Sequence, residues 1–360
     1  MRALILPALL CVACGAKGPR EERYAIPLEV RPNSVHVVAA DPGANLVALG
    51  RGLKTPGVVV IDRRTKKVSF DEARWLITTD APLVQGDDGV IENLETGRTL
   101  RFADAGLAVD STYRFTGVQL VRVLSGETES IVEAVDERGQ TWTSRVALPD
   151  GARVDAVAAS EAAKSVALLV EGYGALAGSA YLVFLDLTTG REERRLELHS
   201  AVGDVLAFSE DGASMLLVVG GDKPRLALID ARSGQVRAAG TGAFPRLPSR
   251  SGGSRMHVAQ DRFWIFEFWE YPTPSHPGPS GLGPRDGLPE TGCHLVAGTV
   301  DGSTLRIGDR DSADLAKDLR SGDWRTNCRL RGALASPAGG ALAVIVGDAD
   351  VTLRPFQLTP

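Results

Sequence analysis

AFSEDGASMLLVVGG (207–221), followed by LALIDARSGQVRAA (226–239), is the stretch whose pattern determines the fold. A strand of small residues comes first, then a turn of the form Ser-x-Asp-Gly, then a fully apolar strand. The second part adds a Leu-rich strand, a polar hairpin turn and a strand that alternates between polar and apolar residues. Short strands separated by turn residues, without a long amphipathic helix, predict an all-β fold.

The same unit recurs over most of the chain. Its first half is repeated with variations at 39–50, 158–172 and 335–348, and its second half at 58–70, 89–102, 130–146, 181–198 and 294–308. The hairpins of the second half contain Gly97, Gly139, Gly190 and Gly234. These glycines lie where a tight hairpin needs a positive φ.

The repeats resemble the blades of WD-repeat-like and related bacterial β-propellers, in which about 40–45 residues form one four-stranded antiparallel sheet. Hairpin turns near Asp62, Glu95, Asp136, Asp186, Asp230 and Asp301 are spaced by 33, 41, 50, 44 and 71 residues. Small residues on the first strand of each unit fit the narrow centre of such a ring. The resemblance implies a single propeller of seven blades, with six or eight as alternatives. A two-domain β-sandwich protein is the other architecture that the pattern allows.

Both ends of the repeat region lack a strand partner. The last unit ends at VTLRPFQL (351–358) without an outer strand, and AIPLEV (25–30) stands alone near the other end. Propellers commonly pair their two termini in one blade, which removes an exposed sheet edge. We therefore expect the ring to be closed by pairing of 25–30 with 351–358.

Residues 1–13 have the three parts of a secretory signal. Met1-Arg2 is positively charged, 3–10 is a short apolar run, and the small or medium-sized side chains of Val12 and Ala13 precede Cys14. The apolar run is far shorter than the ~20 residues that span a bilayer. A lipobox usually has Leu where this chain has Cys11, so a plain secretory signal with an incidental cysteine is the alternative.

The segment resembles a bacterial lipoprotein signal peptide. The resemblance implies lipidation of Cys14, a flexible tether at 14–23 and a propeller domain at 24–360. The expected location is the bacterial cell envelope, with the lipid in the outer membrane and the domain facing the periplasm. The membrane is then contacted through the N-terminal lipid alone.

Two cysteines remain once the signal and the lipidation site are set aside. An exported chain meets an oxidising compartment, so we expect a disulfide between Cys293 and Cys328. Closing the loop of about 35 residues between them would contribute about 3–4 kcal/mol to the free energy of unfolding on the chain-entropy model. A metal site is the competing interpretation, although neither CxxC nor HxH spacing is present.

An insertion interrupts the repeats at 272–292, a Pro/Gly-rich loop after the aromatic strand DRFWIFEFWEY (261–271). Long loops inside compact folds are usually functional or disordered. The aromatic strand is either blade core or a platform for a partner or ligand. The candidate binding residues around this insertion are Trp264, Trp269, Tyr271, His276 and Trp324.

Composition and motifs argue against several functions. The 45 acidic and 40 basic residues are interspersed without a basic stripe, which disfavours nucleic-acid binding. The five histidines lack the spacing of metal ligands or of a catalytic triad, and GxSxG, HExxH and phosphate-cradling glycine motifs are missing from the sequence. We assign no catalytic residue, cofactor or metal, and we expect a monomer.

The expected function is a non-catalytic protein–protein interaction or scaffold role in the cell envelope. A propeller hydrolase or lyase acting on an envelope polymer is one alternative, and a carbohydrate or small-ligand binding protein is another. Carboxylates or a histidine at a pocket in the channel mouth would favour the enzyme. A flat aromatic patch around 263–292 would favour the binding module.

The lipid anchor gives a direct prediction. Cys14→Ser removes the thiol to which a lipid would be attached, so the variant protein is expected to leave the membrane fraction. Fractionation with mass spectrometry of the mature chain measures this. Retention of the variant in the membrane with an unchanged mass would contradict the lipoprotein interpretation.

Overall fold

The computed structural model describes residues 21–27, 30, 34–51, 55–103, 111–172, 179–198, 201–219, 225–240, 254–259, 262–270, 291–307, 330–335 and 341–356. Within these ranges the chain forms β-strands, numbered β1 to β28, and turns. No helix in this described part has the length and apolar character needed to cross a membrane.

Four consecutive strands pair antiparallel in each of the first sheets along the chain. The first two contain β2 (Val37–Ala40), β3 (Leu46–Gly50), β4 (Val58–Asp62) and β5 (Lys67–Asp71), then β6 (Trp75–Leu76), β7 (Leu83–Gln85), β8 (Ile91–Asn93) and β9 (Thr99–Leu100). The next two contain β10 (Ser111–Phe115), β11 (Leu120–Ser125), β12 (Glu129–Asp136) and β13 (Gly139–Ala147), then β14 (Ala152–Ser160), β15 (Ser165–Gly172), β16 (Ala180–Asp186) and β17 (Glu192–Leu198).

An eight-stranded sheet follows, in the order β18-β19-β20-β21-β25-β24-β23-β22. Its strands are β18 (Ala201–Phe208), β19 (Ser214–Val219), β20 (Arg225–Asp230), β21 (Val236–Gly240), β22 (Ser254–Ala259), β23 (Arg262–Glu270), β24 (Thr291–Asp301) and β25 (Thr304–Ile307). Its two antiparallel halves are joined by a short parallel pairing of β21 with β25, at Ala239–Thr304 and Gly240–Leu305. The expected number of seven blades depends on taking these halves as two blades.

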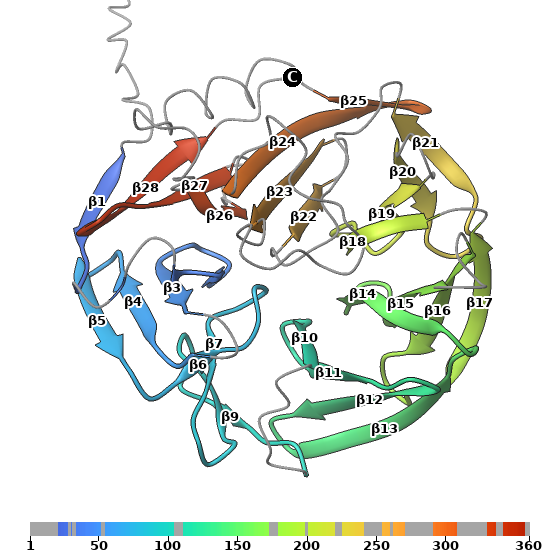
Figure 1. The fold of residues 1–360 in the computed structure, drawn as a ribbon, viewed down its shortest axis with the longest axis horizontal. Helices are drawn as coiled ribbons and strands as arrows, with labels where there is room; N and C mark the ends of the chain where they lie inside the picture. Colours follow the sequence, from blue (N-terminus) through green and yellow to red (C-terminus); the bar gives the residue numbers. More distant parts are fainter. Residues whose placement is uncertain are drawn as a thin grey trace, which may run out of the picture.

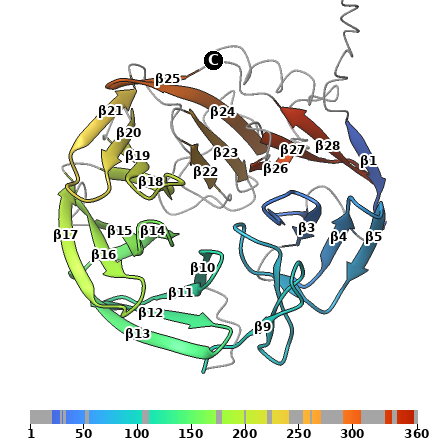
Figure 2. The same ribbon diagram turned by 180° about the vertical axis from the view of Figure 1, so that it is seen from behind.

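The sheets are arranged radially in a ring, with their first strands near the centre and their last strands at the rim (Figure 1, and from behind in Figure 2). The central strands contact one another from sheet to sheet: β2 contacts β6, and β14 contacts both β10 and β18. The fold is therefore a β-propeller, as the repeats predict, and not a pair of β-sandwiches.

Apolar clusters fill the spaces between neighbouring sheets. On β15, Val166, Leu168 and Val170 pack toward the β10–β13 sheet. The alternate residues Ala167 and Leu169 pack toward the β18–β21 half-sheet. Because both faces of the sheet are covered, this strand is apolar at every one of these positions, which explains the fully apolar second strand of the repeat.

The ring is closed by its two ends, as expected. β1 (Glu22–Ala25) pairs antiparallel with β28 (Asp350–Phe356), and β27 (Ala341–Val346) and β26 (Leu330–Ala335) complete this sheet toward the centre. The closing strand begins three residues earlier than AIPLEV, so the predicted position was wrong. Pro27 has no N–H to donate to a sheet, and the pairing ends as Ile26 N donates to Ala349 O at 3.0 Å.

The hairpin glycines have the expected backbone conformation. Gly97, Gly190 and Gly234 have φ values of 70°, 70° and 73°, and Gly139 has 120°. In the β16–β17 hairpin a Cβ on Gly190 would lie 2.3 Å from the Trp142 ring of the preceding sheet. A Cβ on Gly97, in the β8–β9 hairpin, would meet nothing within 4 Å.

This pair separates backbone strain from packing between sheets. Gly97→Ala is expected to destabilise by about 1–2 kcal/mol, the cost of a left-handed residue. Gly190→Ala is expected to lower the free energy of unfolding by about 1–3 kcal/mol more than Gly97→Ala, because the Trp142 ring must move. Urea unfolding of both variants measures the difference. Equal losses of unfolding free energy would show that the close contact between Gly190 and the Trp142 ring does not contribute to stability.

Candidate functional site

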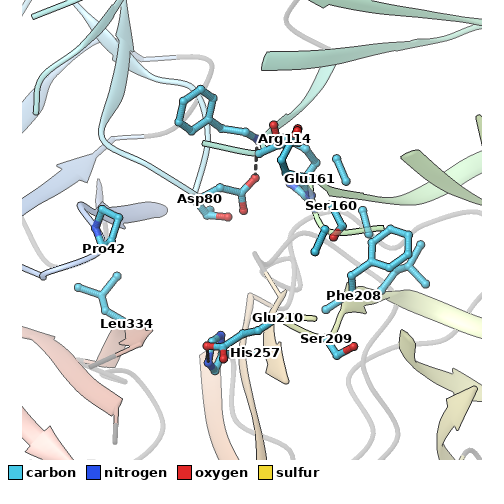
Figure 3. Close-up of a pocket in the computed structure, with 18 of the residues that line it drawn as sticks. Pro42, Asp80, Arg114, Ser160, Glu161, Phe208, Ser209, Glu210, His257 and Leu334 are labelled. Atoms are coloured by element: carbon cyan, nitrogen blue, oxygen red, sulfur yellow. Dashed lines mark hydrogen bonds and ion pairs between the residues drawn. The ribbon is translucent and has the colours of Figure 1, made fainter. Parts of the chain in front are cut away.

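A cavity of about 750 Å³ lies at the centre of the ring, where the first strands of the sheets end (Figure 3). Residues at or near the ends of β2, β10, β14, β18, β22 and β26 line it, namely Ala40, Phe115, Ser160, Phe208, His257 and Leu334. Thr79 and Asp80 reach it from the loop after β6. Every sheet of the ring therefore contributes to one cavity wall.

Small side chains on the inner strands leave room for this cavity. Ala158, Ala159, Ala207 and Ala333 all line it. The strands converge toward the centre, where larger side chains would fill the space. The volume lies within the range of about 300–1,000 Å³ that is typical of small-ligand sites.

Two of the four carboxylates in the cavity wall bond to backbone N–H groups. Asp41 is 6% exposed and accepts a hydrogen bond from Leu46 N at 2.6 Å within its own hairpin. Asp80 accepts from Phe115 N at 2.9 Å and so links the second sheet to the third. Asp41 is thus a turn residue, whereas Asp80 joins neighbouring sheets at the cavity.

The cavity wall also contains one guanidinium and a carboxylate that is paired locally. Arg114 donates to the carbonyl of Val157 in the next sheet at 2.7 Å and to Tyr113 O at 2.9 Å. Glu161 pairs with Lys164 in the β14–β15 turn. Arg114 is therefore held by its own strand and by the next sheet, and Glu161 is held by its own turn.

His257 and Glu210 lie side by side in the cavity wall. His257 Nε2 lies 3.2 Å from Glu210 Oε1, and the imidazole stacks on Trp264 with ring centroids 5.7 Å apart. Burial lowers the pKa of His257, and the Glu210 carboxylate acts in the opposite direction. Trp264 is 4% exposed, and its indole N–H has no hydrogen-bond partner among the described residues.

A carboxylate and a histidine at a channel-mouth pocket are the features that favour the enzyme alternative. Ser209 is the hydroxyl next to Glu210, but its Oγ donates to Asp211 Oδ1 at 2.5 Å and accepts from Ser214 N at 2.9 Å. This serine therefore shapes its turn and is not held against His257 as a nucleophile. In the described part of the chain, no group of three or more His, Cys, Asp or Glu is placed to hold a metal ion.

One predicted binding residue is found at the cavity. Trp264 lines it from β23, although most of its side chain is core. Trp269 lies further along β23, opposite Gly292 of β24, and Cys293 follows in the same pairing. Cys14, Tyr271, His276, Trp324 and Cys328 lie outside the described residues.

Sequence reasoning missed Asp80, Arg114, Glu210 and His257. A signal was available for Glu210, because it follows a small-residue strand and Ser209, as Glu161 follows Ser160 in an earlier repeat. The residues just after each small-residue strand come together at the cavity. Asp80 and Arg114 lie outside this repeat position and carry no such signal.

The comparisons with known proteins agree with the class of fold. A scan of protein-family models found no match, and a search of curated proteins found none either. Among solved structures, the chain is similar to hydrazine synthase of Kuenenia stuttgartiensis, with 12% identity, a TM-score of 0.51 and 91% of this chain and 97% of that chain covered.

Two further structures are similar. The propeller domain of Cps50 (Swd1) of Myceliophteria thermophila is 12% identical with a TM-score of 0.50, covering 92% of this chain and 99% of that one. BamB from Moraxella catarrhalis is 15% identical with a TM-score of 0.44, covering 89% and 85%. The similarity to the Cps50 (Swd1) propeller domain supports the β-propeller fold, and at 12% identity it supports the fold alone.

The His257–Glu210 pair gives a pH-dependent prediction. Because burial lowers the pKa of His257 below its usual value of 6.5, the folded state binds fewer protons than the unfolded state below that pH. Stability should therefore fall as pH drops through about 6.5. Urea unfolding between pH 7.5 and 5 measures this loss.

Two variants isolate the contribution of the imidazole. His257→Gln is expected to flatten this part of the profile, and Glu210→Gln is expected to steepen it, because the carboxylate that raises the pKa is removed. Identical profiles in wild type and both variants would show that the pKa of His257 is the same in the folded and the unfolded state.

Proposed function

We propose that this chain is a lipid-anchored β-propeller of a bacterial cell envelope that binds a partner protein and catalyses no reaction. The observation that carries the proposal is the central cavity, to which every sheet contributes a residue. A rigid ring of this kind holds polar groups from distant parts of the sequence at fixed positions. Such a face is suited to receiving a projecting segment of another protein.

The anchor and the ring lie close together in the chain. Only the residues between Cys14 and Glu22 separate the proposed lipid from the first strand, a reach of at most about 30 Å when fully extended. The propeller would therefore work near the membrane surface, which fits a periplasmic domain on the outer membrane. The proposed Cys293–Cys328 disulfide would tie β24 to the segment before β26.

A propeller hydrolase or lyase is the second candidate, and the pairing of His257 with Glu210 in the cavity favours it. Binding is the better-supported role, because Ser209 bonds within its turn and Arg114 to backbone carbonyls. A general base also needs a nucleophile or a substrate proton within hydrogen-bond reach. None of the contacts described here supplies a nucleophile to His257.

The proposed function is tested by capturing partners from native envelopes with the anchored protein. Glu161→Arg reverses a charge in the cavity wall at a side chain that is 35% exposed. Glu95→Arg makes the same change on the exposed β8–β9 hairpin, away from the cavity. We expect Glu161→Arg to reduce the amount of captured partner at least fivefold and Glu95→Arg to leave it unchanged.

Deletion of 272–290 is the third bait and tests the Pro/Gly-rich insertion. Loss of the partner on this deletion, with full retention by Glu161→Arg, would move the binding site from the cavity to the insertion. A partner retained equally by all three baits would contradict both sites.

A further inference from the structure

The cavity is negatively charged. Its charged lining residues are Asp41, Asp80, Glu161, Glu210 and Arg114, together with His257. The carboxylates belong to four different parts of the ring and outnumber the single guanidinium. A recess in which one sign of charge predominates between low-dielectric walls concentrates the field and attracts ions of the opposite sign.

The nearby cations leave two of these carboxylates available to a ligand. Arg114 is directed to the carbonyls of Val157 and Tyr113. Asp80 receives its hydrogen bonds on Oδ2, and Glu210 meets His257 through Oε1 with 61% of its side chain exposed. Figure 3 shows Asp80 and Glu210 on different sides of the open centre of the cavity.

The cavity wall also contains a buried donor without a partner. Trp264 forms part of the cavity wall and is 4% exposed, and its indole N–H is unpaired within the described residues. Leaving a buried donor without an acceptor costs about 1–3 kcal/mol. This N–H has almost no surface of its own open to the cavity, so the charge of the lining carboxylates, and not an acceptor on the ligand, is what selects the ligand.

We propose that the cavity binds an organic cation, an ammonium or guanidinium group, supplied by a Lys or Arg side chain of the partner protein. Asp80 and Glu210 are the carboxylates that receive it. The proposal rests on the function proposed above, since it names the chemistry that the partner brings to the same cavity.

The test is isothermal titration calorimetry on the full mature chain in detergent, at low ionic strength where screening is weak. The probes are acetyl-Gly-Arg-Gly amide, its uncharged counterpart acetyl-Gly-citrulline-Gly amide, and propylguanidinium as a free guanidinium compound of the same single charge. We expect the arginine peptide to bind at least tenfold more tightly than the citrulline peptide. Added salt should weaken the binding of the arginine peptide and leave that of the citrulline peptide unchanged.

Matched variants locate the binding site. Asp80→Asn combined with Glu210→Gln preserves side-chain size, removes two charges and is expected to weaken arginine-peptide binding at least tenfold. Glu210→Gln alone, at a largely exposed side chain that does not risk the fold, is expected to weaken it about threefold or more. Glu95→Gln, on the exposed β8–β9 hairpin, is expected to leave binding unchanged.

Equal binding of the two peptides, no effect of the double variant, or no binding of either cation would overturn the proposal. Tighter binding of the arginine peptide than of propylguanidinium supports a partner side chain. Propylguanidinium binding as tightly as the peptide overturns that source in favour of a free small cation. Partner loss with Glu161→Arg but no cation binding overturns this inference alone, and cation binding without partner loss overturns the proposed function alone.

Discussion

The structure depends on one constraint: each sheet has two apolar faces, so no sheet is stable without a neighbour on both sides. On β15, Leu168 contributes to the cluster shared with the preceding sheet and Leu169 to the cluster shared with the following one. A ring satisfies this constraint for all sheets at once, provided that its ends meet. The pairing of β1 with β28 meets that condition and covers the outer edge of β28, which would otherwise be open to pairing with another chain.

The same constraint creates the cavity. Radial sheets converge at their first strands, so these strands need small residues such as Ala158, Ala207 and Ala333. The turns that follow need polar residues to satisfy backbone N–H groups, as Asp41 does for Leu46 N. Polar groups required by the turns therefore collect around an opening required by the packing. Side chains that the turns do not need, such as Glu210, are left to meet a ligand.

The sequence predicts the fold well because its signals are local. Alternation, small-residue strands and the hairpin glycines at Gly97 and Gly190 each specify one strand or turn, and the ring follows from their repetition. The predicted position of the closing strand was wrong by three residues. Tertiary packing of Ile26 and the absence of a backbone N–H on Pro27 decide where the pairing stops. The site was harder to predict because Asp80 and His257 lie far apart in the chain and meet only through ring geometry.

Closure of the ring also bears on the proposed anchor, since the proposed tether would precede the closing strand directly in the chain. Two ion pairs hold this region, Glu22 with Arg63 of the first sheet at 2.6 Å and Glu21 with Arg354 of β28 at 3.0 Å. Their side chains are about a quarter to a third exposed, so each contributes at most about 1 kcal/mol. Burial of Ile26, 7% exposed within the cluster shared by the last and first sheets, contributes about 1.5–3 kcal/mol. Apolar packing therefore holds the closing strand more strongly than its charges, and raising the salt concentration should loosen the ring very little.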